Sequence, residues 1–148
     1  ARLFGVRAYA AVTIDRRAHR IRQDTRQGPV LDYDTLAMWE WPEWTAPRAP
    51  EVVRLLGVLV PGRSWRAALA DACRLRGFAA TAILASEPGE ECLLECALWG
   101  VGVVDTATGR LAAPAASGRA PHTRRRALDR WIEELLYDTW LHQPVTAH

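Results

Sequence analysis

The sequence predicts an α/β protein built on a mixed β-sheet, and an α+β arrangement is the alternative. Three observations predict this class. Two short apolar runs, at 79–85 and 101–105, are typical of buried strands, and a helix-like stretch separates them. Residues 3–24 alternate in places between apolar and polar side chains, which predicts an N-terminal antiparallel hairpin. The last part of the chain has the amphipathic spacing of a long helix.

The length of the chain favours a single domain over 1–148. Its 148 residues are 49% hydrophobic and 24% charged, a composition that can bury one core of ordinary size. No apolar run is long enough to span a membrane and no signal-peptide pattern is present, so we expect a cytoplasmic protein without a membrane partner. The preference for Arg over Lys and the abundant Ala indicate a high-GC coding sequence, and we expect a bacterial source.

The centre of the predicted sheet is a strand–helix–strand unit at 79–105. Its helix is expected over 87–99, with Ser86 as the N-cap and Gly100 at the end. A helix that connects two buried strands normally makes a right-handed crossover between parallel neighbours. The two apolar runs are therefore predicted to lie side by side and to point the same way.

The N-terminal third is predicted to be mostly extended. The hairpin at 3–24 turns at 15–19, and a further extended segment covers 30–41. A proline-rich loop follows at 42–50, and the apolar residues of 50–59 are spaced as in a helix that stops before Pro61 and Gly62.

Two further helices are predicted to flank the sheet. One covers 65–76, with Ser64 as its N-cap. After the central unit, 110–112 is expected to return as a short antiparallel strand, and a loop rich in small residues follows. The final amphipathic helix is expected to begin at Thr123 as its cap and to end before Pro144.

Arginine supplies every basic side chain of this protein. All 19 basic residues are arginine, so a Schiff-base lysine and a P-loop lysine are both excluded. The formal net charge is only +2, which by itself implies neither a nucleic-acid nor a membrane partner. The charges alternate in blocks along the chain. These blocks either pair with one another across the fold or bring several arginines to one face.

The three cysteines do not form a recognisable site. Their number is odd, which does not fit the disulfide framework of a small secreted protein. Cys92 and Cys96 are one helical turn apart, but neither a third cysteine nor a nearby histidine completes a metal site. We expect Cys73, Cys92 and Cys96 to be buried free thiols.

The first candidate site is a pair of carboxylates at the strand ends. Parallel strands end at the same edge of a sheet, so Glu87 and Asp105 are expected to lie close together there. Carboxylate oxygens are typical Mg²⁺ ligands, and such a site could support phosphodiester hydrolysis. The alternative is structural, since Glu87 suits a helix start and Asp105 suits a turn.

The second candidate site is a group of arginines near the start of the last helix. Three consecutive arginines at 124–126 are predicted to occupy its first turn, where positive charge is unfavourable unless an anion binds. Arg119 and His122 precede them, and arginines of the hairpin could assist. The predicted nucleic-acid-binding residues are Arg16, Arg17, Arg20, Arg22, Arg119, Arg124, Arg125 and Arg126. The alternative is that these arginines pair with acidic residues or point into water.

The third candidate site is a tryptophan-rich segment. The protein has seven Trp, and Trp39, Trp41 and Trp44 lie within six residues of one another together with two glutamates. The acidic charges disfavour a nucleic-acid stacking surface. Two interpretations stay open: a binding surface for a protein partner or a second copy of the chain, and an edge strand that covers the core.

These sites give one leading hypothesis and two alternatives. The sequence contains no catalytic triad, no His-x-x-x-His pair and no Gly-rich phosphate loop, so we favour a non-catalytic domain that binds nucleic acid or another polyanion and needs no cofactor. The enzymatic alternative is a Mg²⁺-dependent nuclease or phosphotransferase that uses Glu87 and Asp105. The third possibility is an interaction subunit that binds its partner through the tryptophan-rich segment.

Overall fold

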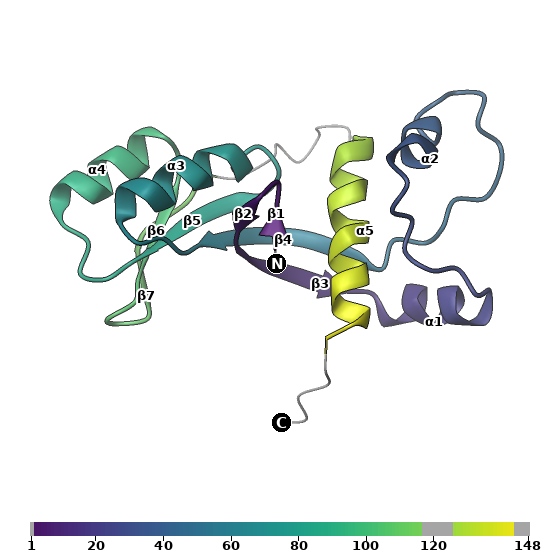
Figure 1. Ribbon diagram of the computed structural model, residues 1–148, viewed down its shortest axis with the longest axis horizontal. Helices are drawn as coiled ribbons and strands as arrows, with labels where there is room; N and C mark the ends of the chain where they lie inside the picture. Colours follow the sequence, from purple (N-terminus) through teal and green to yellow (C-terminus); the bar gives the residue numbers. More distant parts are fainter. Residues whose placement is uncertain (1, 117–125, 144–148) are drawn as a thin grey trace. The chain divides into compact units, whose positions relative to one another are not determined.

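Residues 2–116 and 126–143 are described by a computed structural model, which confirms the predicted α/β class (Figure 1). Within these residues, two sheets occur. A two-stranded antiparallel sheet pairs β1 with β2, and a five-stranded mixed sheet has the order β3-β4-β5-β6-β7. The chain divides into two compact units, Ala1–Val12 with Leu55–Thr123 (the first unit) and Thr13–Arg54 with Arg124–His148 (the second unit). The single domain over 1–148 stays a prediction.

The central strand–helix–strand unit is confirmed. Strand β5 (Ala80–Ala85) lies parallel to β6 (Gly102–Asp105), with Ile83 opposite Val103, and α4 (Glu90–Leu98) connects them. In Figure 1, α4 and α3 (Trp65–Leu75) lie on the same face of these strands. Two parallel crossovers in succession explain this, because β4 (Val53–Val60) also pairs in parallel with β5.

Two of the predicted helix ends in the first unit are confirmed, and a third is wrong. Ser64 caps α3 as predicted, since its Oγ accepts a hydrogen bond from the N–H of Ala67. Gly100 ends α4 in the left-handed conformation, with φ +67°, and completes a Schellman motif. The predicted start of this helix is wrong, because Gly89 and not Ser86 is the N-cap of α4.

The antiparallel additions to the sheet are only partly where we predicted them. Strand β7 (Arg110–Ala113) pairs antiparallel with β6, as expected. The N-terminal hairpin is much shorter than 3–24: β1 (Arg2–Leu3) and β2 (Val6–Arg7) are joined by Phe4 and Gly5, both with positive φ. Positive φ at both central residues is typical of a tight type I′ turn.

The core of the first unit is apolar. The side chains of β4, β5 and β6 that point inward are almost inaccessible to solvent, and so are residues of α3 and α4 that cover them. The largest side chains of this unit that are fully buried are Val58, Val60, Leu75, Thr81, Ile83, Cys92, Cys96, Val101 and Val103.

The second unit is helical where we predicted extended chain. Strand β3 (Tyr9–Ile14) is followed by Asp15, the N-cap of α1 (Arg16–Asp24), and this helix replaces the predicted second arm of the hairpin. Helix α2 (Tyr33–Met38) lies within the segment predicted as extended over 30–41. Two aspartates explain both corrections, because the carboxylates of Asp15 and Asp32 accept hydrogen bonds from the first N–H groups of these helices.

One predicted helix is a strand. The segment 50–59 was expected to be helical, but β4 covers Val53–Val60. Three of its apolar residues are valine, whose branched Cβ favours the extended backbone, and both faces of the strand carry apolar side chains. A strand that is apolar on both faces and a short buried helix have the same composition, so periodicity alone did not separate them.

The last helix begins later than predicted. Helix α5 covers Ala127–Leu141 with Arg126 as its N-cap, so Arg126 does not lie in the first turn. The predicted cap, Thr123, lies outside the described residues. Helices α2 and α5 lie side by side (Figure 1) and enclose a small apolar cluster of Leu36, Trp39 and Ala127. Among the described residues, no helix is long and apolar enough to cross a membrane.

Candidate functional site

The carboxylate pair predicted at the strand ends forms a structural turn. Asp105 Oδ1 accepts hydrogen bonds from the backbone N–H groups of Glu87 and Ala107, both at 3.0 Å, and Oδ2 accepts one from the hydroxyl of Thr108. The bonds from Ala107, Glu87 and Thr108 hold the pKa of Asp105 below its ordinary value. Thus Asp105 has the turn role that was its structural alternative, whereas Glu87 contacts it through its backbone and lies before α4, not at the helix start.

The described residues do not assemble a Mg²⁺ site at this edge. Three hydrogen bonds already occupy most of the acceptor capacity of the Asp105 carboxylate. Within 2–116 and 126–143, no group of three or more His, Cys, Asp or Glu side chains is placed to hold a metal ion. The residues present at the strand ends therefore do not fit the group that the nuclease hypothesis requires.

The start of α5 is satisfied by carboxylates of the protein. Asp129 accepts a hydrogen bond from the N–H of Arg126 at 2.7 Å, and Glu40 accepts one from the N–H of Ala127. These carboxylates supply the negative charge that the helix dipole favours at this end. We had predicted an external anion here, and the structure gives no need for one at these two N–H groups. Arg119, His122, Arg124 and Arg125 lie outside the described residues.

The predicted arginines of the hairpin lie on α1, where they are separated into two faces. Arg16, Arg17 and Arg20 are exposed. Arg22 points the other way, is 1% exposed and makes a bidentate ion pair with Glu134, at 2.9 and 2.6 Å. A buried and fully paired guanidinium cannot reach a phosphate, so Arg22 was wrongly placed among the nucleic-acid-binding residues.

The three tryptophans do not form one surface. Trp39 is 9% exposed and belongs to the apolar cluster between α2 and α5, and Trp44 packs against the same cluster. The indole N–H of Trp44 is buried and has no acceptor among the described residues. Only Trp41, at 59% exposure, is open to solvent. The edge strand that was the alternative is also wrong, because Trp39 directly follows helix α2.

The cysteines are free, as predicted. Cys92 and Cys96 are buried in α4 and Cys73 is half-buried. Burial raises the pKa of the Cys96 thiol to about 12, and it also raises the pKa of Cys92. Because only the thiolate is a good nucleophile, burial makes these two residues unreactive.

A buried network of charges in the second unit was not predicted. Besides Arg22, Glu134 binds the Nε–H of Arg130 at 2.9 Å and the backbone N–H of Val30. Arg130 also donates to the carbonyl oxygens of Ala49 and Pro50 and pairs with Glu51 at 3.1 Å. Burial lowers the pKa of Arg130, and the charge of Glu134 opposes this effect.

The sequence contained a signal for this network. Arg130, Glu134 and Tyr137 recur at helical spacing along α5, on the side that also carries Ala127. Charged residues at the helix positions that face the core require partners of opposite charge elsewhere in the protein. Arg22 occupies the corresponding buried position of α1, one turn after Ala18.

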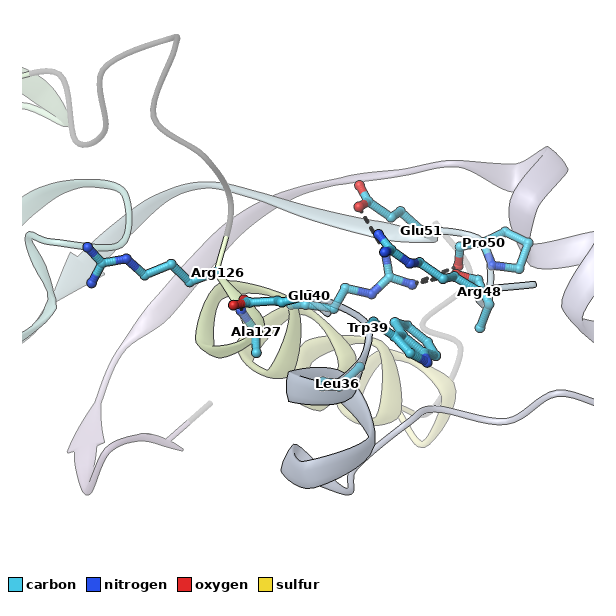
Figure 2. Close-up of a pocket in the computed structure, with 10 residues that line it drawn as sticks. Leu36, Trp39, Glu40, Arg48, Pro50, Glu51, Arg126 and Ala127 are labelled. Atoms are coloured by element: carbon cyan, nitrogen blue, oxygen red, sulfur yellow. Dashed lines mark hydrogen bonds and ion pairs between the residues drawn. The ribbon is translucent and has the colours of Figure 1, made fainter. Parts of the chain in front are cut away.

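A cavity of about 330 Å³ lies beside this network (Figure 2). Its apolar wall is formed by Leu36, Trp39 and Ala127, and its polar residues include Glu40, Arg48, Glu51 and Arg130. Figure 2 shows Arg48 on the same side as Pro50 and Glu51, whereas Arg126 points away from them. None of the sequence patterns indicated this cavity, because its residues come from three separate segments.

Comparisons with known proteins add no family or function. No protein-family model matches the chain, and the comparison with curated proteins and with solved structures found no match either.

Proposed function

We propose that this protein is a binding module for nucleic acid, which it holds through phosphates with the exposed arginines of α1. We define Arg16, Arg17 and Arg20 as the arginine face. The observation that carries the proposal is that all three are exposed on the side of α1 opposite Ala18 and Arg22, and none of them pairs with a described residue.

The arginine face works against the stability of its own helix. Arg16 and Arg20 are one turn apart, and like charges at this spacing destabilise a helix by about 0.2–0.5 kcal/mol. Arg16 and Arg17 also lie at the positive end of the helix dipole, where cations are unfavourable. Asp24 follows Arg20 by one turn but makes no ion pair with it. A bound polyanion would relieve this repulsion.

The rest of α1 holds the face in place. Arg22 is fixed by Glu134 and by the carbonyl oxygens of Pro50 and Gly28, and the ring of His19 contacts the hydroxyl of Tyr137 at 2.9 Å. A rigid helix therefore presents three guanidinium groups, each able to bind phosphate oxygens with two parallel hydrogen bonds. Contacts of this kind give affinity without reading the base sequence.

The proposal is tested by the salt dependence of binding to a labelled DNA duplex and a labelled single-stranded RNA. Three phosphate contacts predict a slope of log K against log salt of about −2.7 for the duplex, because each contact contributes about −0.9. The triple change Arg16→Ala, Arg17→Ala and Arg20→Ala should remove most of this slope and of the binding at low salt. Competition by inorganic polyphosphate distinguishes a general polyanion site from a nucleic-acid site.

The matched control removes three exposed arginines from the first unit: Arg7→Ala, Arg63→Ala and Arg110→Ala. It changes the net charge equally and leaves α1 intact. Equal losses in the two triple variants would mean that only net charge matters, and an absence of binding by the unchanged protein at low salt would end the proposal.

We also propose that the protein works in the cytoplasm. The support is its set of three free cysteines, which is common where thiols are kept reduced. Cell fractionation tests this, and recovery of the folded protein outside the cytoplasm would contradict it.

A further inference from the structure

We propose that the cavity beside Arg130 is a binding site for a small organic anion with a compact apolar body. It lies wholly within the second unit, and it shares no residue with the arginine face. The inference is independent of the nucleic-acid proposal and rests on the size of the cavity, its apolar wall and its balance of charge.

The apolar wall defines the body of the ligand. Leu36 and Ala127 are buried and Trp39 is 9% exposed, so the side of the cavity that they form is shielded from water. Small-molecule pockets have volumes of about 300–1,000 Å³, and this cavity is near the lower end of that range. A single ring or a short branched chain fits it better than a large molecule does.

The walls are fixed before any ligand binds. Arg130 donates to Ala49, Pro50, Glu51 and Glu134, and its guanidinium lies 5.8 Å from the centre of the Trp39 ring. Ordered walls of this kind lower the entropic cost of binding, because few side chains have to be immobilised.

The charges in the cavity define the polar group of the ligand. Glu51 is paired with Arg130, and Glu40 accepts the hydrogen bond from the first N–H of α5, so both carboxylates are engaged. Arg48 makes no hydrogen bond or ion pair with any described residue. The charge left for a ligand is therefore positive, and the ligand should be an anion.

Arg48 is the residue we assign to the anion. It lies on the same side of the cavity as Glu51 and Pro50, whereas Arg126, whose guanidinium also pairs with no carboxylate of the described residues, extends away from them (Figure 2). A guanidinium at the edge of an apolar wall can bind a carboxylate or a phosphate with two hydrogen bonds while the body of the ligand contacts the wall.

Isothermal titration calorimetry with four probes tests the site. Phenyl phosphate and benzoate carry both a ring and an anion, inorganic phosphate lacks the ring, and benzyl alcohol lacks the charge. We expect binding of at least one aromatic anion, with affinity at least tenfold higher than for either incomplete probe. The preferred aromatic anion then identifies the phosphate or the carboxylate as the natural polar group.

Arg48→Ala should weaken binding of that aromatic anion about tenfold or more, and Arg48→Lys should lose less. Arg48 is exposed, so both variants are expected to fold. Arg63→Ala is the control, because it removes the same charge from an exposed position outside both the cavity and the arginine face, and it should bind the probe normally.

Three outcomes of these binding experiments would overturn the inference. Millimolar aromatic anion without measurable heat, equal binding of inorganic phosphate, or an unchanged affinity in Arg48→Ala would each contradict it. These outcomes are distinct from those of the nucleic-acid proposal, since the triple arginine-face variant should retain the aromatic anion and Arg48→Ala should retain nucleic-acid binding.

Discussion

The two units of this protein bury different kinds of side chain. Among the described residues of the first unit, Thr81 is the only polar side chain that is buried, and its hydroxyl donates to the carbonyl oxygen of Ala79. The part of the second unit that the structure describes buries four charged residues: Arg22, Asp129, Glu133 and Glu134. The first core is thus held by apolar contacts, and the second also depends on paired charges.

The two kinds of core should respond differently to amino-acid substitution. Apolar burial has no direction, so a core of valine and isoleucine accepts a substitution of similar volume. A buried ion pair is different, because the desolvation of each charge is compensated only when its partner is present. Substitutions in the second unit should therefore cost more than their size suggests.

The largest effect is expected from Glu134→Ala. This change leaves Arg22 and part of Arg130 buried without their carboxylate, and breaking a buried pair in this way costs about 3–5 kcal/mol. Glu134→Gln keeps one acceptor oxygen and should cost less. Urea unfolding followed by circular dichroism measures both values.

The control for Glu134 is Glu43→Ala, which removes the same charge from an exposed position. It should change the free energy of unfolding by less than about 0.5 kcal/mol. If Glu134→Ala cost no more than Glu43→Ala, the buried network would contribute nothing to stability and the contrast between the two units would disappear.

Removal of a helix N-cap from either unit should lower the free energy of unfolding by less than Glu134→Ala does. Asp15 accepts two hydrogen bonds at 2.8 and 2.9 Å at the start of α1, whereas Ser64 accepts one at 3.3 Å at the start of α3. Loss of an N-cap costs about 0.5–2 kcal/mol. We expect Asp15→Ala near the upper end of this range and Ser64→Ala near the lower end, measured by the same unfolding experiment.

The reverse order would show that hydrogen-bond geometry does not set the strength of these caps. Asp15→Asn separates charge from hydrogen bonding, because it keeps an acceptor oxygen. A stability close to that of the unchanged protein would assign the effect to the hydrogen bonds.

The same contrast explains which parts of the fold the sequence could predict. The strands at β5 and β6, the crossover by α4 and the helix α3 were predicted because their buried positions carry apolar residues at regular spacing. Helix α1 was missed because one of its two buried residues is Arg22, which counts as polar in any hydrophobic pattern.

The candidate sites show the same limit. The approach of 87 to 105 followed from the parallel strands, but hydrogen bonds from the backbone gave Asp105 a structural role. The sequence groups the arginines of α1 as one block, but only the structure separates the exposed Arg16, Arg17 and Arg20 from the buried Arg22. The cavity depends on the tertiary placement of Arg48 beside α2 and α5, which no local pattern encodes.

The smallest effect is expected from two exposed aspartates, one in each unit, that stabilise turns in the same way. Asp32 accepts hydrogen bonds from the side chain and backbone of Thr35 and from the backbone of Asp34, and these lower its pKa as the bonds to Asp105 do. A carboxyl group whose pKa is lower in the folded state contributes stability above its unfolded pKa of about 4. That contribution is lost as the pH falls through the lower, folded value.

Asp32→Asn and Asp105→Asn should therefore reduce the free energy of unfolding at pH 7, and the difference from the unchanged protein should shrink as the pH falls below about 4. Amide hydrogen exchange measured at pH 7 and pH 3.5 locates the loss. If the two units open separately, Asp32→Asn should speed exchange in α2 and Asp105→Asn in β6, each without affecting the other. Equal acceleration of exchange in both elements by either change would show that the units unfold together. If the difference in the free energy of unfolding between variant and unchanged protein grew as the pH fell, hydrogen bonding to the carboxylates would not lower their pKa.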